Sequence, residues 1–398
     1  MTPTGLLLTD SAPRTRLQKE IPPHRAPYKA SSVVLLLAAS YPDAMPQPAA
    51  RFPESLGDLG AHVELRIEAL LTSEHVRWSA VDPTLGDPID ALRALVLAGG
   101  KRLRPAFAAA GLVAAGGSTE SPNLIDAGAA LELLHTFALV HDDVMDGSRI
   151  RRNMPAVHAR FECAHAANEW RGETRRFGEG IAILVGDFAF VYADTLLRRA
   201  SPKTLALWDE LRLELCVGQS LDLLGAAHRN TDIDFAHRIA RYKSAKYTVE
   251  RPLHLGAALA DRLDDLRTPL SAIGLPLGTA FQLRDDLLGV FGDEAATGKP
   301  VGDDFREGKP TPLVAIASAN ADAEGHRQLG RIGAADLDDV EIKQLQELLV
   351  TTGAVRGIER EISDLVDEAS LAIESAPIPD TAKELLNELA AYCAWRDH

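Results

Sequence analysis

Two aspartate-rich segments are the parts of this sequence best suited to chemistry. The first is HDDVMD at residues 141–146, followed closely by two adjacent arginines, Arg151 and Arg152. On a helix the i,i+4 spacing stacks Asp142 over Asp146, so that two carboxylates point the same way from adjacent turns. Mg²⁺ is usually held by one or two carboxylates together with water and phosphate oxygens, and guanidinium groups bind the phosphate oxygens that the metal leaves free. The segment predicts a metal–diphosphate site, although an isolated acidic cluster is equally typical of a solvated helix surface.

The second acidic segment favours the metal interpretation. In FQLRDDLLG, Asp285 and Asp286 again end an apolar helix, and two glycine-bracketed lysines, Lys299 and Lys309, follow on a predicted loop. Lysines held between glycines suit phosphate capture better than packing. Two Asp-rich helix ends that face each other across a bundle can clamp several Mg²⁺ ions around one diphosphate.

Other polar side chains lie where a second anion could bind. GGKRLRP at residues 99–105 ends one helix and opens the next with three cations, which suits a diphosphate, although a basic helix start at the surface is the simpler alternative. His135 precedes Asp142 by two helical turns and so shares nearly the same face. Gln219 and Asp222 are polar residues in an apolar helical segment and need partners. Lys243 and Ser244 offer a cation and a hydroxyl before another apolar segment, and Gln282 lies one turn before Asp285.

Helices must position these groups. Residues 1–55 contain nine prolines and predict a disordered extension, within which Met45 is an alternative start to Met1. Residues 56–398 predict an all-α fold, a single-domain bundle of many helices around a deep central cavity, with no convincing strand. Ser121 and Pro122 predict the start of a helix that ends at Asp146.

Breaks between the predicted helices are expected at glycines and prolines. Pro269 and Pro276 are among these expected breaks. A polar loop, a candidate lid, is expected at residues 161–176.

Composition excludes some classes of function. The 42 basic and 57 acidic residues give a net charge of −15, which argues against nucleic acid as the partner. Three scattered cysteines predict neither a disulfide framework nor a zinc site, so the expected location is cytoplasmic. The apolar stretch at residues 33–40 is too short for a membrane span, and no stable membrane insertion is expected.

In their order along the chain, these motifs resemble those of the trans-isoprenyl diphosphate synthases, or polyprenyl synthetases. The resemblance covers about residues 60–395 and is strongest to bacterial geranylgeranyl diphosphate synthases. It rests on GGKRLRP, HDDVMD with its trailing arginines, GQSLD, Lys243-Ser244, FQLRDD and the TGKP…GDD…EGKPT loop. It implies a homodimeric, Mg²⁺-dependent prenyltransferase that condenses isopentenyl diphosphate with an allylic diphosphate. The expected allylic substrate is dimethylallyl, geranyl or farnesyl diphosphate, and the expected product is geranylgeranyl diphosphate.

The resemblance also implies roles for individual residues. Several Mg²⁺ ions would be bound by Asp142, Asp146 and Asp285, with support from Asp143 and Asp286. The allylic diphosphate would be held by Arg151, Lys243, Ser244, Gln282, Lys299 and Lys309, with Gln219 and Asp222 orienting Lys243 and metal-bound water. Isopentenyl diphosphate would be held by Lys101, Arg104, His135 and Arg152, with Arg102 assisting. Product length would be set by Phe137 and Ala138, an aromatic and a small residue before the first aspartate.

Three positions depart from the family pattern. Gly289 stands where the second motif usually has its third acid, Ser244 replaces a threonine, and Asn153 replaces a glycine. Two other functions therefore stay open: a catalytically silent regulatory partner of another synthase, and a class I terpene cyclase. The cyclase needs no isopentenyl site, and a silent partner should have lost acidic ligands or the paired arginines, whereas this chain retains them.

Overall fold

The computed structural model describes residues 50–292, 302–334 and 336–396. Its α-helices are α2 (Gly57–Ser79), α3 (Gly86–Val96), α4 (Leu103–Ala114), α5 (Pro122–Asp146), α6 (Val157–Ala167), α7 (Thr174–Leu197), α8 (Pro202–His228), α9 (Ile233–Ile239), α10 (Arg251–Leu259), α11 (Leu263–Phe291), α13 (Asp303–Glu307), α14 (Pro312–Asn320), α15 (Ala323–Leu329), α16 (Asp339–Thr351), α17 (Ala354–Ser375) and α18 (Asp380–Trp395). The other described elements are the 3-10 helices η1 (Glu54–Leu56) and η2 (Pro83–Leu85), the π-helix η3 (Ala240–Glu250), and strands β1 (Ile150–Arg151) and β2 (Met154–Pro155).

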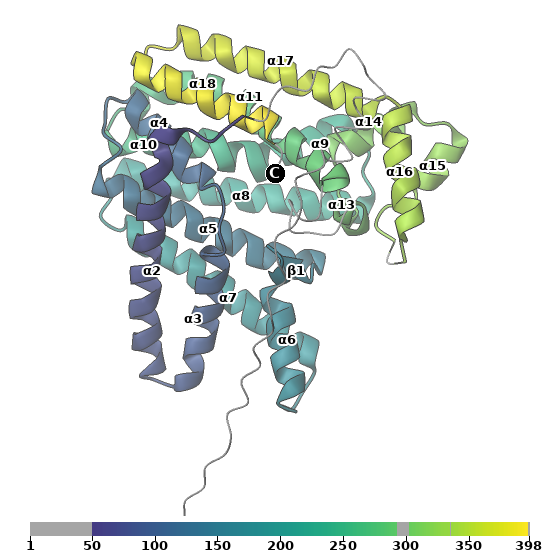
Figure 1. Ribbon diagram of the computed structural model, residues 1–398, viewed down its shortest axis with the longest axis horizontal. Coiled ribbons are helices and arrows are strands. Elements are labelled where there is room, and N and C mark those ends of the chain that lie inside the picture. The colour runs from purple at the N-terminus through teal and green to yellow at the C-terminus, as the bar shows by residue number, and fades with distance from the viewer. Residues whose placement is uncertain (1–49, 293–301, 335, 397–398) are drawn as a thin grey trace, which may run out of the picture.

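The helices pack around two apolar cores that share one long helix. The larger core includes residues of α2 to α5, α7, α8, α10 and the first half of α11, while the smaller one packs the second half of α11 against α13, α14, α16 and α17. Figure 1 shows α17 and α18 running together along one edge of the molecule, with α13 to α16 gathered at one side. The expected all-α fold is confirmed.

Local sequence signals account for α5 but not for α11. Helix α5 begins at Pro122, directly after Ser121, and ends where Gly147 adopts a left-handed φ of 71°, as the sequence predicts. The breaks expected at Pro269 and Pro276 are wrong, because both prolines lie inside α11. A proline removes one backbone hydrogen bond and bends a helix, but packing along a long buried helix can outweigh that penalty.

Two glycines let the π-helix η3 lie close to its neighbours. A Cβ built on Gly218 of α8 would lie 2.3 Å from the backbone nitrogen of Lys243, and one on Gly278 of α11 would lie 2.5 Å from the carbonyl oxygen of Ala245. Any larger residue at either glycine would push η3 away. The close approach therefore fixes the depth at which Lys243 and Ser244 enter the bundle.

A short hairpin, which the sequence did not predict, places the paired arginines. Ile150 pairs with Pro155 and Arg151 with Met154, in an antiparallel arrangement. The two turn residues, Arg152 and Asn153, both have positive φ angles, 52° and 59°, as the tight turns of hairpins require. Asparagine tolerates this conformation better than most residues, so Asn153 can stand where the family pattern has glycine.

The expected lid at residues 161–176 is wrong. Residues 161–167 belong to α6, and α7 begins at Thr174. Helices α6 and α7 pack against each other, and Phe161 and His165 are buried. This segment is consequently part of the bundle and has no polar loop of the expected length.

The first described residues of the chain contact its last helix, α18. The backbone nitrogen of Ala50 donates to Trp395, and Phe52 packs edge-on against Tyr392, so residues 50–53 contact α18. Residues 1–49 of the expected extension lie outside the described residues.

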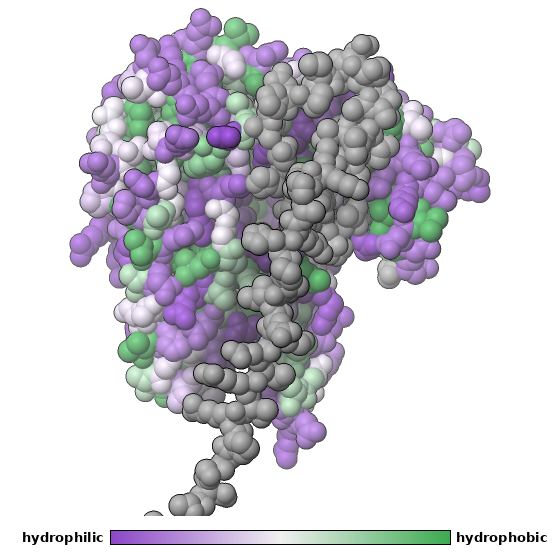
Figure 2. Space-filling model, viewed as in Figure 1, coloured by the Kyte–Doolittle hydropathy of each residue, from purple (hydrophilic) through white to green (hydrophobic). Residues whose placement is uncertain are grey.

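Two helices, α5 and α7, are long and apolar enough to cross a membrane by composition, but both are bundle helices that pack on each other. The face in Figure 2 is mostly hydrophilic, with apolar residues in small separate groups.

Candidate active site

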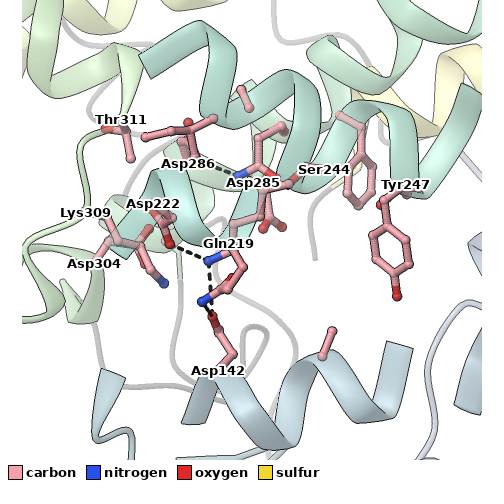
Figure 3. Close-up of a pocket in the computed structure, with 18 of the residues that line it drawn as sticks. Asp142, Gln219, Asp222, Ser244, Tyr247, Asp285, Asp286, Asp304, Lys309 and Thr311 are labelled. Carbon is pink, nitrogen blue, oxygen red and sulfur yellow. Dashed lines mark hydrogen bonds and ion pairs between the residues drawn. The ribbon is translucent and has the colours of Figure 1, made fainter. Parts of the chain in front are cut away.

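A cavity of about 460 Å³ opens between α5, α8, η3, α11 and the segment from α13 to α14. Figure 3 shows Asp142 on one side of this cavity and Asp285 and Asp286 on the other. The structure therefore brings the two acidic motifs together across one space. We call the end of α5 the first acidic end and the end of α11 the second acidic end.

Cations and an amide hold Asp142 at the first acidic end. Its Oδ1 accepts from Lys243 Nζ at 3.1 Å and from Gln219 Nε2 at 3.0 Å, while Oδ2 lies 3.8 Å from an Arg151 nitrogen. Burial alone would raise the pKa of Asp142, but Lys243, Lys309 and Arg151 together hold that pKa well below its usual range. Asp142 is thus a fixed, ionised carboxylate that faces the cavity.

Lys243 is fixed in turn by Asp222. The lysine Nζ donates to Asp222 Oδ2 at 2.5 Å, as well as to Asp142. Burial lowers the pKa of Lys243, but the two carboxylates more than reverse this and raise it. Gln219 and Asp222 have the orienting geometry expected of them, one toward Asp142 and the other toward Lys243.

Asp146 lies one turn beyond Asp142, and nearby cations offset its negative charge less completely than they offset that of Asp142. Burial, and then the charge of Asp142, raise the pKa of Asp146 to about 7. Its Oδ2 is buried and has no hydrogen-bond partner within the described residues, although Lys309 Nζ lies 4.0 Å away. A buried carboxylate oxygen in this state is what a cation site requires before the cation binds.

Asp143 does not face the cavity, which differs from the metal role expected of it. Its side chain is 1% exposed, and Oδ1 accepts from Arg151 at 2.9 Å and 2.5 Å. At the i+1 position the side chain points about 100° away from that of Asp142. We therefore assign Asp143 to holding Arg151, which does line the cavity.

The second acidic end is more open. The Asp285 side chain is 59% exposed and accepts a hydrogen bond at 3.2 Å from Arg396, beyond α18. Asp286 is buried and accepts from Gln282 at 2.6 Å. Burial, and next the charge of Asp304, raise the pKa of Asp286 well above its usual range. Gly289 lines the cavity one turn after Asp285.

Lys309 connects α13 with the first acidic end. Its Nζ lies 3.3 Å from Asp304 Oδ1, 4.0 Å from Asp146 Oδ2, and in contact with Glu307. Burial would lower the pKa of Lys309, but the surrounding carboxylates raise it well above its usual range. Lys299, the other lysine expected to bind the allylic diphosphate, lies outside the described residues.

Cations also gather around His135, two turns before Asp142 on α5. Arg104 and His135 line the cavity, and Arg104 donates to Thr248 at 3.0 Å and stacks over Tyr247. Burial, then the charges of Arg104 and Arg152, hold the pKa of His135 well below its usual range. The His135 Nδ1 is buried without a hydrogen-bond partner in the part of the chain that the structure describes. Arg152 is placed nearby by its hydrogen bond to Leu95, and Lys101 is exposed at the start of α4.

Arg102 does not belong to this cationic group, contrary to the expectation that it assists substrate binding. The residue is 6% exposed, and its guanidinium donates to Glu132 at 2.6 Å, to Glu64 at 2.8 Å and 3.0 Å, and to the Val96 carbonyl. Its backbone takes a left-handed φ of 50°, which turns the side chain away from its neighbours in the motif. Arg102 is a buried structural cation.

The two residues expected to set product length differ in position. Ala138 lines the cavity one turn below Asp142. Phe137 does not line it, since its ring packs against Phe190 of α7 and His141, with centroids 4.8 Å and 4.7 Å away. Phe137 therefore lies behind the cavity wall.

Several lining residues carry no role in the sequence-based predictions. They are Tyr247, Thr248, Asp303, Asp304 and Thr311. The GDD run at residues 302–304 was visible as a motif, but only the lysines around it received a role. The sequence shows the hydroxyls of Tyr247 and Thr248, but it does not reveal the π-helix η3, which decides which way these side chains face.

The donor set fits a hard divalent cation. All the candidate ligands are carboxylate oxygens, and Asp146 offers a buried oxygen with no hydrogen-bond partner among the described residues. No group of three or more acidic, histidine or cysteine residues in the described ranges is arranged to hold a metal ion on its own. Mg²⁺ typically accepts one or two protein carboxylates and takes its other ligands from water and phosphate. A diphosphate would therefore have to complete the coordination.

A helix bundle that encloses one cavity between two acidic helix ends defines the class of all-α isoprenoid synthases. Residues 89–349 match the family model for polyprenyl synthetase. Geranylfarnesyl diphosphate synthase of Aeropyrum pernix is 30% identical over 312 residues, which cover 76% of this chain and 92% of that protein. The (2E,6E)-farnesyl diphosphate synthase of Mycobacterium bovis is 32% identical over 301 residues, covering 74% and 79%.

A solved structure of a related synthase has the same fold as this chain. The crystal structure of geranylgeranyl pyrophosphate synthase from Corynebacterium glutamicum, complexed with isoprenyl diphosphate and magnesium, matches with a TM-score of 0.81 and 38% sequence identity, covering 86% of this chain and 99% of the other. This chain belongs to the polyprenyl synthetase family. The expected family and the expected enzyme class, a trans-prenyltransferase, are confirmed.

Proposed function

We propose that this trans-prenyltransferase condenses isopentenyl diphosphate with an allylic diphosphate in a Mg²⁺-dependent reaction, and that its main product is geranylgeranyl diphosphate. The observation that carries this proposal is the pair of acidic helix ends that face each other over one cavity, which is also lined by Arg104, Arg151, Lys243 and Lys309. Relatives and neighbours named for farnesyl, geranylgeranyl and geranylfarnesyl products support the chemistry more strongly than the product length.

The allylic diphosphate would lie between the two acidic ends. Asp142, Asp146 and Asp285 would hold Mg²⁺, which when bound offsets negative charge on the leaving diphosphate. Arg151, Lys243 and Lys309 are already held in place by carboxylates, so their positive charges need little rearrangement as that charge develops. Ser244 and Gln282 line the same space and can add neutral hydrogen bonds.

Isopentenyl diphosphate would bind the cationic group near His135. Arg104, Arg152 and Lys101 offer positive charge there, and the His135 Nδ1 still has bonding capacity. From this position the double bond can approach the allylic carbon deeper in the cavity. Among the described residues that line the cavity, none stands out as a base for the final proton, so the departing diphosphate is our candidate acceptor.

The growing chain would pass Ala138 on its way into the apolar part of the bundle. A larger residue at Ala138 would block that path, so Ala138→Phe should shorten the product. Phe137→Ala would open space between α5 and α7 behind the same wall, and we expect it to lengthen the product by one or more isoprene units with little loss of rate. An unchanged product spectrum in both variants would remove this part of the proposal.

We also propose a cytoplasmic homodimer. Helices α7 and α8 are joined by the Arg212–Asp194 ion pair at 2.6 Å, and both expose large apolar side chains, which favours an interface. These side chains are Ile183, Leu184 and Val191 on α7, and Leu213, Val217 and Leu224 on α8. Light scattering at micromolar concentration should give the mass of a dimer, and a monomeric mass would contradict the proposal.

Elongation assays test the function directly. Purified protein is incubated with labelled isopentenyl diphosphate and, separately, with dimethylallyl, geranyl or farnesyl diphosphate, with Mg²⁺ or with a chelator, and the dephosphorylated products are sized. We expect Mg²⁺-dependent products that end at about twenty carbons. Other lengths would keep the chemistry and discard the chain-length argument. No elongation from any starter would favour the silent partner, and a cyclised hydrocarbon would favour the terpene cyclase.

A further inference from the structure

The acid that the second motif lacks has a counterpart on another helix. We propose that Asp304 supplies the third carboxylate of the second acidic end, and that Gly289 is the residue that leaves room for it. This inference rests on the proposed function, because it concerns the Mg²⁺–diphosphate group that the two acidic ends would hold. On this proposal, the glycine at position 289 is needed to make room for the Asp304 carboxylate, and it does not indicate that a metal ligand has been lost.

The geometry of Gly289 is the first observation. Gly289 follows Asp285 by four residues, so both positions share one face of α11. A Cβ built on Gly289 would lie 2.0 Å from Asp304 Oδ2 and 2.8 Å from its Cγ. Non-bonded heavy atoms settle at about 3.5–4.0 Å, so a side chain at 289 and the Asp304 carboxylate cannot occupy these positions together. The carboxylate of Asp304 fills the volume in which the third acid of the motif would begin.

The second observation is that α13 holds Asp304 firmly in that position. This short helix lies between Gly302 and Gly308, both with left-handed φ angles of 73° and 74°. Phe305, the next residue, is 1% exposed and belongs to the smaller core. The Asp304 side chain also pairs with Lys309 at 3.3 Å. The carboxylate is therefore placed by packing on one side and by an ion pair on the other.

Several carboxylates lie close to Asp304. Asp285, Asp286 and Asp304 all line the same cavity. Lys309 contacts Asp304 and Glu307, and it also approaches the buried Asp146 Oδ2, which has no hydrogen-bond partner in the described ranges. One lysine thus faces two acids of α13 and one acid of the first acidic end. A divalent cation bound with a diphosphate between the two ends would relieve this repulsion, and Asp304 would bind it directly or through water.

Four variants separate this role from general disturbance of the site. Asp304→Asn keeps the shape and removes the charge. Gly289→Asp alone forces a second carboxylate against Asp304, whereas Gly289→Asp combined with Asp304→Ala moves the acid to the usual position of the motif. Asp339→Asn is the matched control, since Asp339 is 91% exposed and pairs with Arg306 of the same helix α13.

The readout is binding, measured by calorimetry with methylenediphosphonate in the presence and absence of Mg²⁺. We expect Asp304→Asn and Gly289→Asp each to weaken the Mg²⁺-dependent binding by about tenfold or more. The double variant should return to within about threefold of the unmodified protein, and Asp339→Asn should leave binding unchanged. Circular dichroism confirms that each variant is folded, and the pair Asp304→Asn and Asp339→Asn decides the matter even if the double variant does not fold.

Two failures can be told apart. If the unmodified protein shows no Mg²⁺-dependent binding of the diphosphonate, the proposed function fails and Asp304 loses its role with it. If the unmodified protein binds but Asp304→Asn binds equally well, only the assignment of Asp304 is overturned. If the double variant binds the diphosphonate no more tightly than Gly289→Asp alone, an acid at position 289 cannot replace the acid at position 304, and the proposal is contradicted.

Discussion

The two acidic ends of the cavity carry similar motifs but are built differently. At the first, Asp142 is held by Lys243, Gln219 and Arg151, all of which contact it directly. At the second, Asp285 is more than half exposed and its third acid comes from Asp304 on another helix. One end is complete within a single helix and its supporting cations, whereas the other is assembled from two elements. Loss of an acid from a motif is therefore a weak indication of lost function unless the surrounding helices are known.

The largest effect is expected at the preorganised end. Asp142→Ala removes a proposed metal ligand that three groups position, so turnover should fall by about a thousandfold or more while helicity stays nearly constant. Asp126→Ala is the control, because Asp126 lies at the other end of α5 and pairs with Arg66, with both side chains more than a third exposed. Initial rates and circular dichroism measure both quantities. Retained turnover in Asp142→Ala would remove the metal assignment.

The titration of Asp146 should be visible in stability without any ligand. Burial and the charge of Asp142 raise its pKa to about 7 from a usual value of 3.8, so the folded state binds the proton more tightly than the unfolded state. Stability then decreases as pH rises from about 4 through 7, since ionisation becomes unfavourable only in the folded protein.

Asp146→Asn cannot ionise and should not lose this stability. In the absence of Mg²⁺ we expect its free energy of unfolding, relative to the unmodified protein, to rise between pH 5 and pH 8 by an amount on the order of 2 kcal/mol. Urea unfolding at the two pH values measures the difference. A constant difference between the two proteins would show that Asp146 is not perturbed in this way.

A smaller effect is expected from Gly289→Ala, which tests the assembled end. The added methyl group would displace the Asp304 carboxylate by steric contact alone, without any change of charge. We expect Mg²⁺-dependent diphosphonate binding to weaken by about tenfold. Gly180→Ala is a control, because a Cβ at that position of α7 meets nothing within 4 Å. Equal binding by both variants would mean that Asp304 tolerates the methyl group or plays no part.

The smallest effect is expected from Arg396→Gln. Arg396 contacts Asp285, but that carboxylate is 59% exposed, and ion pairs with solvent-exposed groups contribute little. Diphosphonate binding with Mg²⁺ should change by less than about threefold. A large loss would show that the second acidic end is as dependent on its cation as the first, and would break the contrast between them.

The sequence predicted what local chemistry determines. The limits of α5, the stacking of Asp142 over Asp146, and the meeting of two acidic motifs all follow from helical periodicity and motif order. The sequence could not separate Arg102 from Arg104, because a left-handed backbone at Arg102 and two distant glutamates, Glu64 and Glu132, decide their directions.

Other differences have the same origin in tertiary packing. The hairpin at residues 150–155 places Arg151 against Asp143. Phe137 is an exception, because helical periodicity alone turns it away from Asp142, and its expected role came from the family resemblance. The prolines of α11 were expected to end a helix, but local propensity is overridden where both sides of the helix are packed. Asp304 could be assigned only once its distance to Gly289 was known.

The central claim is that both acidic ends hold one Mg²⁺–diphosphate group between them. The most direct measurement is calorimetric titration of methylenediphosphonate into the unmodified protein, Asp142→Ala and Asp285→Ala, each with and without Mg²⁺. We expect saturable binding of one ligand per chain only with Mg²⁺, and strong weakening of that binding in both variants. Binding that is independent of Mg²⁺, or that survives the loss of either aspartate, would contradict it.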